Sequence, residues 1–165
     1  MICFLITPCD PNWCIENTGQ AAYNYSFTYN CINFLDDITS CIVSDSMVDI
    51  TLTFKPKRID VSNRDSIYIN YLSQLQLEQK VEHIEADINL YTLISSTNPI
   101  NVIPFSSPAF IAAELEVPAI IYNPSSILNC NHCLPDNIEF IQHSDQLKFE
   151  LRQTLLTAAT SAYTS

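Results

Sequence analysis

Two adjacent serines, Ser106 and Ser107, stand where a protein could hold an anion. An apolar run at 102–105 precedes them, and Pro108 opens a helix-like segment that reaches residue 115. The first backbone N–H groups of a helix lack intrahelical partners, so a strand, a serine turn and a helix can together bind a phosphate or sugar hydroxyls. Ser107 also suits a helix cap with Pro108 at the first helical position, and simple capping is the alternative.

A basic cluster lies in an otherwise acidic chain. Four of the seven Lys and Arg residues fall between Lys55 and Arg64, although the net charge is -11. Two of them, Lys57 and Arg58, closely follow a strand-like segment at 48–54. A local concentration of positive charge can attract an anionic ligand, and a solvated helix start is the alternative. The acidic balance of the whole chain argues against nucleic-acid binding, which depends on Lys and Arg contacts to phosphate.

Asp36 and Asp37 form the best acid–base pair in the sequence. Adjacent carboxylates interact, and one of them could act as a general base toward a hydroxyl. The alternative is a solvated turn, because we expect residues 35–39 to interrupt a helical pattern and residues 41–43 to form a short strand.

Several other kinds of site are excluded. The single glycine, Gly19, leaves no glycine-rich phosphate loop, which argues against P-loop nucleotidases and dinucleotide-binding oxidoreductases, and we expect no cofactor. Cys130, His132 and Cys133 supply three soft ligands where a structural zinc site needs four, so we expect no metal.

The termini and the apolar segments predict a cytoplasmic protein. The N-terminus lacks the basic flank and long apolar core of a secretion signal. No stretch approaches the ~20 apolar residues of a membrane span. We therefore expect no integral membrane segment, although the protein could lie peripherally on the inner membrane face.

Predicted strands and helices alternate along the chain, and these elements must position the residues named above. Residues 2–6 read as a buried strand. From residue 48, strand patterns alternate with helical ones that begin near Ser62, Asp87, Ser107 and Ser144; the strands are expected at 48–54, 81–86, 102–105, 118–122 and 138–141. This alternation predicts an α/β fold, a Rossmann-like three-layer sandwich with a mostly parallel sheet.

In such a sheet the ligand binds beyond the carboxyl ends of the strands. The expected ends carry the basic cluster, the serine pair and Asn123. The pattern therefore brings the predicted anion-binding residues to one edge of the sheet.

The segment 51–156 resembles the nucleotide-binding C-terminal domain of a GT-B glycosyltransferase, and more narrowly bacterial sialyltransferases and polysialyltransferases. Those families carry a K-P-H-P-like motif after a strand and later a serine pair before a helix. The matching segments here are Phe54-Lys55-Pro56-Lys57-Arg58 and Phe105-Ser106-Ser107. Their acidic motif is similar to Leu35-Asp36-Asp37-Ile38. The chain departs from the pattern because Lys57 replaces the histidine and Ile38 replaces the glycine.

The resemblance implies a nucleotide-activated sugar as donor, with CMP-sialic acid favoured, and a glycan acceptor in surface polysaccharide or lipooligosaccharide biosynthesis. Asp36, with Asp37 beside it, would deprotonate the acceptor hydroxyl, and Lys57 would help to offset charge on the leaving nucleotide. The implied donor-binding residues are Lys55, Pro56, Arg58, Ser106, Ser107 and Asn123.

The resemblance also divides the chain into three parts. These are a partial N-terminal segment at 1–47, a nucleotide-sugar-binding domain at 48–160 and a frayed tail at 161–165. A complete enzyme of this type has two Rossmann domains, so a partner subunit could supply the missing N-terminal half. The alternatives are an inactive truncated relic, a partner-binding subunit of a glycosyltransferase, or a receiver-like α/β regulatory domain.

Overall fold

The computed structural model describes the chain in segments. These are residues 2–5, 8, 16, 27–43, 52–55, 66–78, 81–85, 87–96, 101–103, 107–124 and 134–162. Several predicted features lie outside the described residues: the helix start near Ser62, the strand residues 48–51, and the Cys130, His132 and Cys133 cluster.

Six strands form one sheet, and their order is that of a Rossmann fold. The strands are β1 (Ile2–Phe4), β2 (Thr53–Lys55), β3 (Glu82–His83), β4 (Asn101–Ile103), β5 (Ala119–Tyr122) and β6 (Ile138–Ile141). The sheet order is β3-β2-β1-β4-β5-β6, and every pairing is parallel. The predicted parallel Rossmann-like sheet is confirmed. Because β1 lies between β2 and β4, residues on both sides of the expected boundary at 47/48 build the same sheet.

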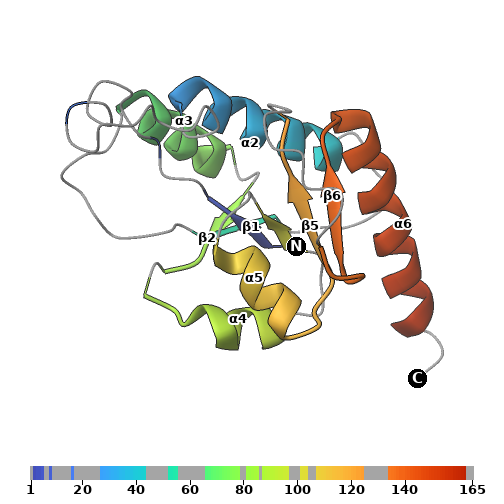
Figure 1. Cartoon of the computed structure of the whole chain (residues 1–165). Coiled ribbons are helices and arrows are strands. Elements are labelled where there is room, and N and C mark those ends of the chain that lie inside the picture. The colour runs from blue at the N-terminus through green and yellow to red at the C-terminus, as the bar shows by residue number, and fades with distance from the viewer. Residues whose placement is uncertain are drawn as a thin grey trace.

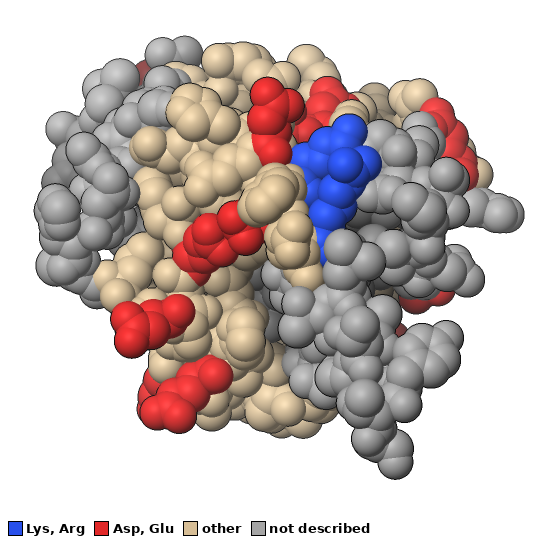
Figure 2. Space-filling view, turned by 90° about the vertical axis from the view of Figure 1, so that its right-hand side faces the viewer, with Lys and Arg blue, Asp and Glu red and all other residues tan. Residues whose placement is uncertain are grey.

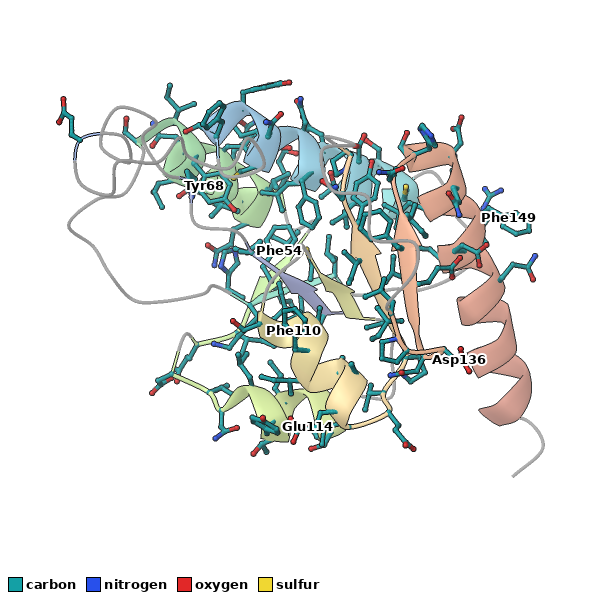
Figure 3. The ribbon with its side chains drawn as sticks, in the orientation of Figure 1. Phe54, Tyr68, Phe110, Glu114, Asp136 and Phe149 are labelled. Atoms are coloured by element: carbon teal, nitrogen blue, oxygen red, sulfur yellow. The ribbon has the colours of Figure 1, made fainter. Side chains whose placement is uncertain are left out.

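Helices cover both faces of the sheet (Figure 1). α2 (Thr28–Val43), α3 (Ser66–Leu77) and α6 (Ser144–Ala162) lie on one side, and α4 (Leu90–Ser96) and α5 (Ser107–Glu114) lie on the other. Figure 3 shows Phe54 and Tyr68 between the sheet and α3, whereas Phe110 and Glu114 belong to the opposite layer. The protein is therefore the predicted three-layer sandwich.

β1 and β5 are buried on both faces, so their apolar residues alternate between two cores. Ile2 and Phe4 pack with α4 and α5, whereas Cys3 packs with α2 and α3. In β5, Ile121 faces α5 and Tyr122 faces α2. Because successive strand residues face opposite sides, the position of a residue in its strand shows on which side of the sheet its side chain lies.

The expected break at residues 35–39 and the expected strand at 41–43 are both wrong, because α2 runs through them without interruption. Phe34, Leu35 and Ile38 are almost fully buried and form the apolar stripe of this helix. The stripe continues on both sides of the two aspartates, and its burial outweighs the low helix propensity of aspartate.

α4 begins later than the predicted helix start near Asp87. Asn89, rather than Asp87, caps this helix: its Oδ1 accepts hydrogen bonds from the backbone N–H groups of Tyr91 and Thr92 at 2.9 and 3.3 Å. Asn and Asp are equally good caps, so the choice depends on where the chain leaves β3 rather than on residue type.

α5 ends in a Schellman motif without glycine. The N–H of Val117 bonds to the carbonyl of Ala112 at 3.0 Å, and the N–H of Glu116 bonds to the carbonyl of Ala113 at 3.2 Å. Glu116 takes a φ of 54°, the left-handed conformation in which glycine is usual. Asn137 reinforces the turn, because its Nδ2 donates to the carbonyls of Ala112 and Val117 at 3.1 and 2.9 Å.

Candidate functional site

Successive strands are added toward one edge of the sheet from β1 to β3 and toward the other edge from β4 to β6, and the switch point between β1 and β4 fixes the expected ligand position. β1 is followed by α2 on one face, whereas β4 is followed by α5 on the other. The connections after the two strands therefore separate. In open α/β sheets such a point makes a crevice beyond the carboxyl ends of the strands.

Lys55 is the most unusual residue at this edge. It is the last residue of β2 and only 2% exposed. Its strand partner in register is Phe4, whose side chain faces α4 and α5, so Lys55 lies on the α5 side of the sheet. Burial lowers the pKa of its ammonium group, and the negative charge of Asp87 opposes that shift. A buried cation is therefore held next to the switch point.

Ser107 approaches the same edge from the other side of β1. It is the first residue of α5 and is exposed, whereas Pro108, Ala109 and Ala112 anchor the helix in the core. One strand, β1, separates β2 from β4, so the ends of these two strands are about 10 Å apart. Ser106 and the rest of the turn lie outside the described residues.

Asn123 adds a second buried polar side chain. It directly follows β5, is 4% exposed, and its backbone N–H donates to the carbonyl of Ile141 at 2.9 Å. Continued alternation from Ile121 and Tyr122 places Asn123 on the α5 side. Lys55 and Asn123 therefore lie on the α5 side of the sheet, at the edge from which α5 begins with Ser107.

The acidic pair lies on the other side of the sheet. Asp36 and Asp37 belong to the middle of α2, not to a turn. Tyr71 of α3 donates its hydroxyl proton to Oδ1 of Asp36, and Tyr122 of β5 donates to Oδ2 of Asp37 at 2.5 Å. Each carboxylate is thus held by a tyrosine from a different element.

Nothing in the sequence indicated that these two tyrosines contact the acidic pair. The pKa of Tyr71 and that of Tyr122 are both raised, first by burial and then by the hydrogen bond to the neighbouring carboxylate. Both hydroxyls therefore stay protonated and act as donors to the carboxylates. The partners are 35 and 85 residues apart in the chain, and no local spacing signals such a pairing.

Charge on the surface is mostly negative. Figure 2 views the molecule from the side that carries α6, where acidic side chains are spread out and the basic atoms form one patch. Among the described Lys and Arg residues, Lys148 and Arg152 of α6 have accessible surface, while Lys55 is buried. The predicted residues Pro56, Lys57 and Arg58 lie outside the described part of the chain.

Two kinds of feature are absent from the described residues. No group of three or more His, Cys, Asp or Glu side chains there is arranged to hold a metal ion. None of the helices in that part of the chain combines the length and the apolar character needed to cross a membrane.

Comparison with known proteins gives one family. No curated protein and no solved structure matches the chain. The family model described as polysaccharide biosynthesis PFTS motif protein matches residues 2–151. The match spans every strand of the sheet, and the chain therefore belongs to the polysaccharide biosynthesis PFTS motif family.

Proposed function

We propose that the protein binds a nucleotide-activated sugar at the carboxyl edge of the sheet and transfers the sugar to a glycan acceptor during polysaccharide biosynthesis. The family assignment supports the process, and the resemblance to GT-B sialyltransferases favours CMP-sialic acid as the donor. One observation carries the donor site: Lys55 is buried at the end of β2, on the side of the sheet from which α5 begins.

Burial of an ammonium group is costly unless an anion compensates for the lost hydration. Asp87 is one negative charge that acts on this ammonium group. A phosphate at the switch point would add a charge-assisted hydrogen bond to Lys55 and accept hydrogen bonds from Ser107 and the first N–H groups of α5. A nucleotide suits the site because a phosphate joined to a sugar can span the roughly 10 Å between the ends of β2 and β4.

The chemistry requires a base on the acceptor side of the donor. Asp36 and Asp37 are the proposed source of that base; they lie in the middle of α2, on the side of the sheet opposite to α5. Glycosyl transfer of this kind places positive groups where charge develops on the leaving phosphate. Lys55 supplies such a group, and Lys57 is proposed to take the place of the histidine found in the related enzymes.

Calorimetric titration with CMP, and separately with UDP, tests the donor site. We expect CMP to bind, and Lys55→Met to weaken binding by about 10- to 100-fold, because a hydrogen bond between charged groups contributes about 1.5–3 kcal/mol. Ser107→Ala should weaken binding by a smaller factor. The matched control is Lys148→Met, which removes the same charge from α6 and should leave binding close to wild type. Binding of neither nucleotide to a folded sample would overturn the proposal.

A further inference from the structure

We propose that Lys148, Phe149 and Arg152 of α6 form a binding surface, the α6 patch, for an acidic glycan that serves as the acceptor chain. This inference rests on the proposed function, because it names the chemical class of the acceptor and the part of the protein that holds it. The α6 patch is separate from the proposed donor-binding residues, which lie on the other side of the sheet.

Phe149 is an exposed aromatic residue on a helix whose apolar stripe is already buried. Leu147 and Leu151 form that stripe and are 0% and 4% exposed, whereas Phe149 is 57% exposed. Figure 3 shows Phe149 on the outer side of α6, directed away from the sheet. Its ring therefore does not belong to the core that holds α6 in place, and its apolar face is accessible to the C–H face of a sugar ring.

Two cationic side chains lie beside this ring. Residues three or four apart in a helix share one face, so Arg152 is adjacent to both Lys148 and Phe149. In Figure 2 the Lys and Arg atoms form one patch on the side of the molecule that carries α6. A guanidinium group binds a carboxylate through two parallel hydrogen bonds, and an ammonium group attracts it as a point charge. An aromatic ring with two cations therefore matches a sugar that carries an acid group.

The two cations lie on the flank of α6 that faces α2. Burial and then Asp37 raise the pKa of the Cys41 thiol in the last turn of α2. Lys148 and Arg152 oppose this shift, and Asp145 adds to it. All three residues of α6 are therefore close to α2. The carboxylate of Asp145 suits a glycan as well, because sugar hydroxyl groups can donate hydrogen bonds to it.

Glu150 lies on the opposite flank of α6. Burial and then Glu150 raise the pKa of Glu139 in β6, so Glu150 lies toward the edge strand of the sheet. At 3.6 residues per turn, Glu150 is about 160° around the helix axis from Arg152, whereas Lys148 is only about 40° from it. Glu150 therefore leaves the helix on the side away from the two cations.

Charge complementarity restricts where an acidic glycan can bind. The net charge of the chain is -11, so most of its surface repels a polyanion. Among the described Lys and Arg residues, the two in the α6 patch are the ones with accessible surface. Within the described part of the chain, an acidic glycan is therefore attracted to the α6 patch.

The small size of the α6 patch favours a glycan over a membrane or a protein. Recognition of anionic lipids uses clusters of about 4–8 basic residues, and the patch contains two. A stable protein interface involves about 20–30 residues on each partner and a larger apolar centre than one ring. A glycan, in contrast, can bind through one or two sugar units.

The position of the α6 patch suits an acceptor chain. α6 begins at Ser144, shortly after the carboxyl end of β6, and Ile141 at that end is in register with Tyr122 at the end of β5. Phe149 is about 7.5 Å further along the helix than Ser144. A polysaccharide is long enough to lie on the α6 patch and to extend to the carboxyl edge, where the donor site is proposed.

Calorimetric titration of the full chain with a sialic acid trimer tests the α6 patch, and maltotriose is the neutral probe of the same length. We expect the acidic trimer to bind and maltotriose to bind more weakly. Phe149→Ala should weaken binding of the acidic trimer by about 3- to 10-fold, because it removes an apolar contact surface. Arg152→Gln should weaken it by about 10-fold through loss of a charge-assisted hydrogen bond.

The matched control is Phe110→Ala, which removes a phenylalanine that is 60% exposed on α5, on the other side of the sheet. It should leave binding of the acidic trimer unchanged. CMP affinity should stay at the wild-type value in the Phe149→Ala and Arg152→Gln variants, because the α6 patch is separate from the donor site. All of these side chains are exposed, so far-UV circular dichroism should show the same fold in every variant.

Several results would overturn the inference while the proposed function survives. One is a sample that binds CMP but not the acidic trimer. Another is a trimer affinity that Phe149→Ala and Arg152→Gln leave unchanged, or that Phe110→Ala lowers equally. Equal binding of maltotriose, or binding to phosphatidylserine vesicles that Phe149→Ala abolishes, would show that the ligand is not an acidic glycan. If the trimer binds at the α6 patch and neither CMP nor UDP binds, the donor site fails and the glycan-binding surface stands.

Discussion

Replacing Lys55 by methionine should stabilise the protein and weaken nucleotide binding at the same time. Methionine keeps an unbranched side chain of similar length but removes the ammonium group. A residue retained for packing would show the opposite result, since its loss would destabilise the fold. The two opposite effects therefore separate a binding role from a structural one.

The size of the stability gain follows from the surroundings of Lys55. The side chain is 2% exposed, and burial is the main cause of its lowered pKa. The attraction of exposed Asp87 offsets part of the cost of burial, by up to about 1 kcal/mol for a pair near the surface. Replacing buried charges by apolar groups of similar volume often stabilises proteins by about 1–4 kcal/mol, and we expect about 1–2 kcal/mol here.

The pH dependence of the free energy of unfolding tests independently whether Lys55→Met stabilises the protein. The pKa of Lys55 is lower in the folded protein than its ordinary value of 10.5, so between these two values the unfolded chain binds more protons than the folded one. Wild-type stability should therefore rise relative to Lys55→Met as the pH increases through that window. The advantage of the variant should be largest near neutral pH and should shrink as the pH approaches 10.5.

Urea unfolding followed by far-UV circular dichroism measures the free energy of unfolding of both proteins at several pH values. Calorimetry with CMP measures binding in the same samples. A variant that is less stable than the wild type at neutral pH, or that binds CMP equally well, would refute the reasoning.

Three further predictions concern the stability of local structure, each measured by urea unfolding. Glu116→Gly should raise the free energy of unfolding by about 0.5–1 kcal/mol, because glycine adopts the left-handed conformation without steric cost; a loss of stability would contradict the Schellman assignment. Asn137→Ala should lower it by about 1–2 kcal/mol, since two carbonyl groups lose a donor, and an unchanged value would show that water replaces the amide. Asn89→Ala should cost about 1 kcal/mol while Asn89→Asp costs little, and equal losses in both would argue against a capping role.

The layer structure could be predicted from the sequence because it depends on local patterns. Apolar runs alternate with helical stripes from residue 48 onward, and each run contributes strand residues to the parallel sheet. The same patterns marked the ends of the strands, which is why Lys55, Ser107 and Asn123 were placed at one edge. The order of the strands could not be predicted in this way. No local pattern in the first strand shows that it lies between β2 and β4.

The course of α2 could not be predicted because its determinants are distant in the chain. Two consecutive aspartates are typical of a turn when only their neighbours are considered. In the folded protein they accept hydrogen bonds from tyrosines of α3 and β5, and the apolar residues on either side of them remain buried. Tertiary contacts therefore override a local signal at the segment proposed to supply the base.

The position of β1 has a consequence for the order of assembly. Ile2 is in register with Thr53 on one side and with Asn101 on the other. Neither half of the sheet can join the other until the chain has been made through β4, and before then β1 keeps at least one edge of unpaired backbone groups. Non-local pairing of this kind slows folding and exposes strand edges to other chains. On the ribosome, the protein should therefore gain protease resistance in one late step after β4 has emerged, and it should depend on chaperones until then.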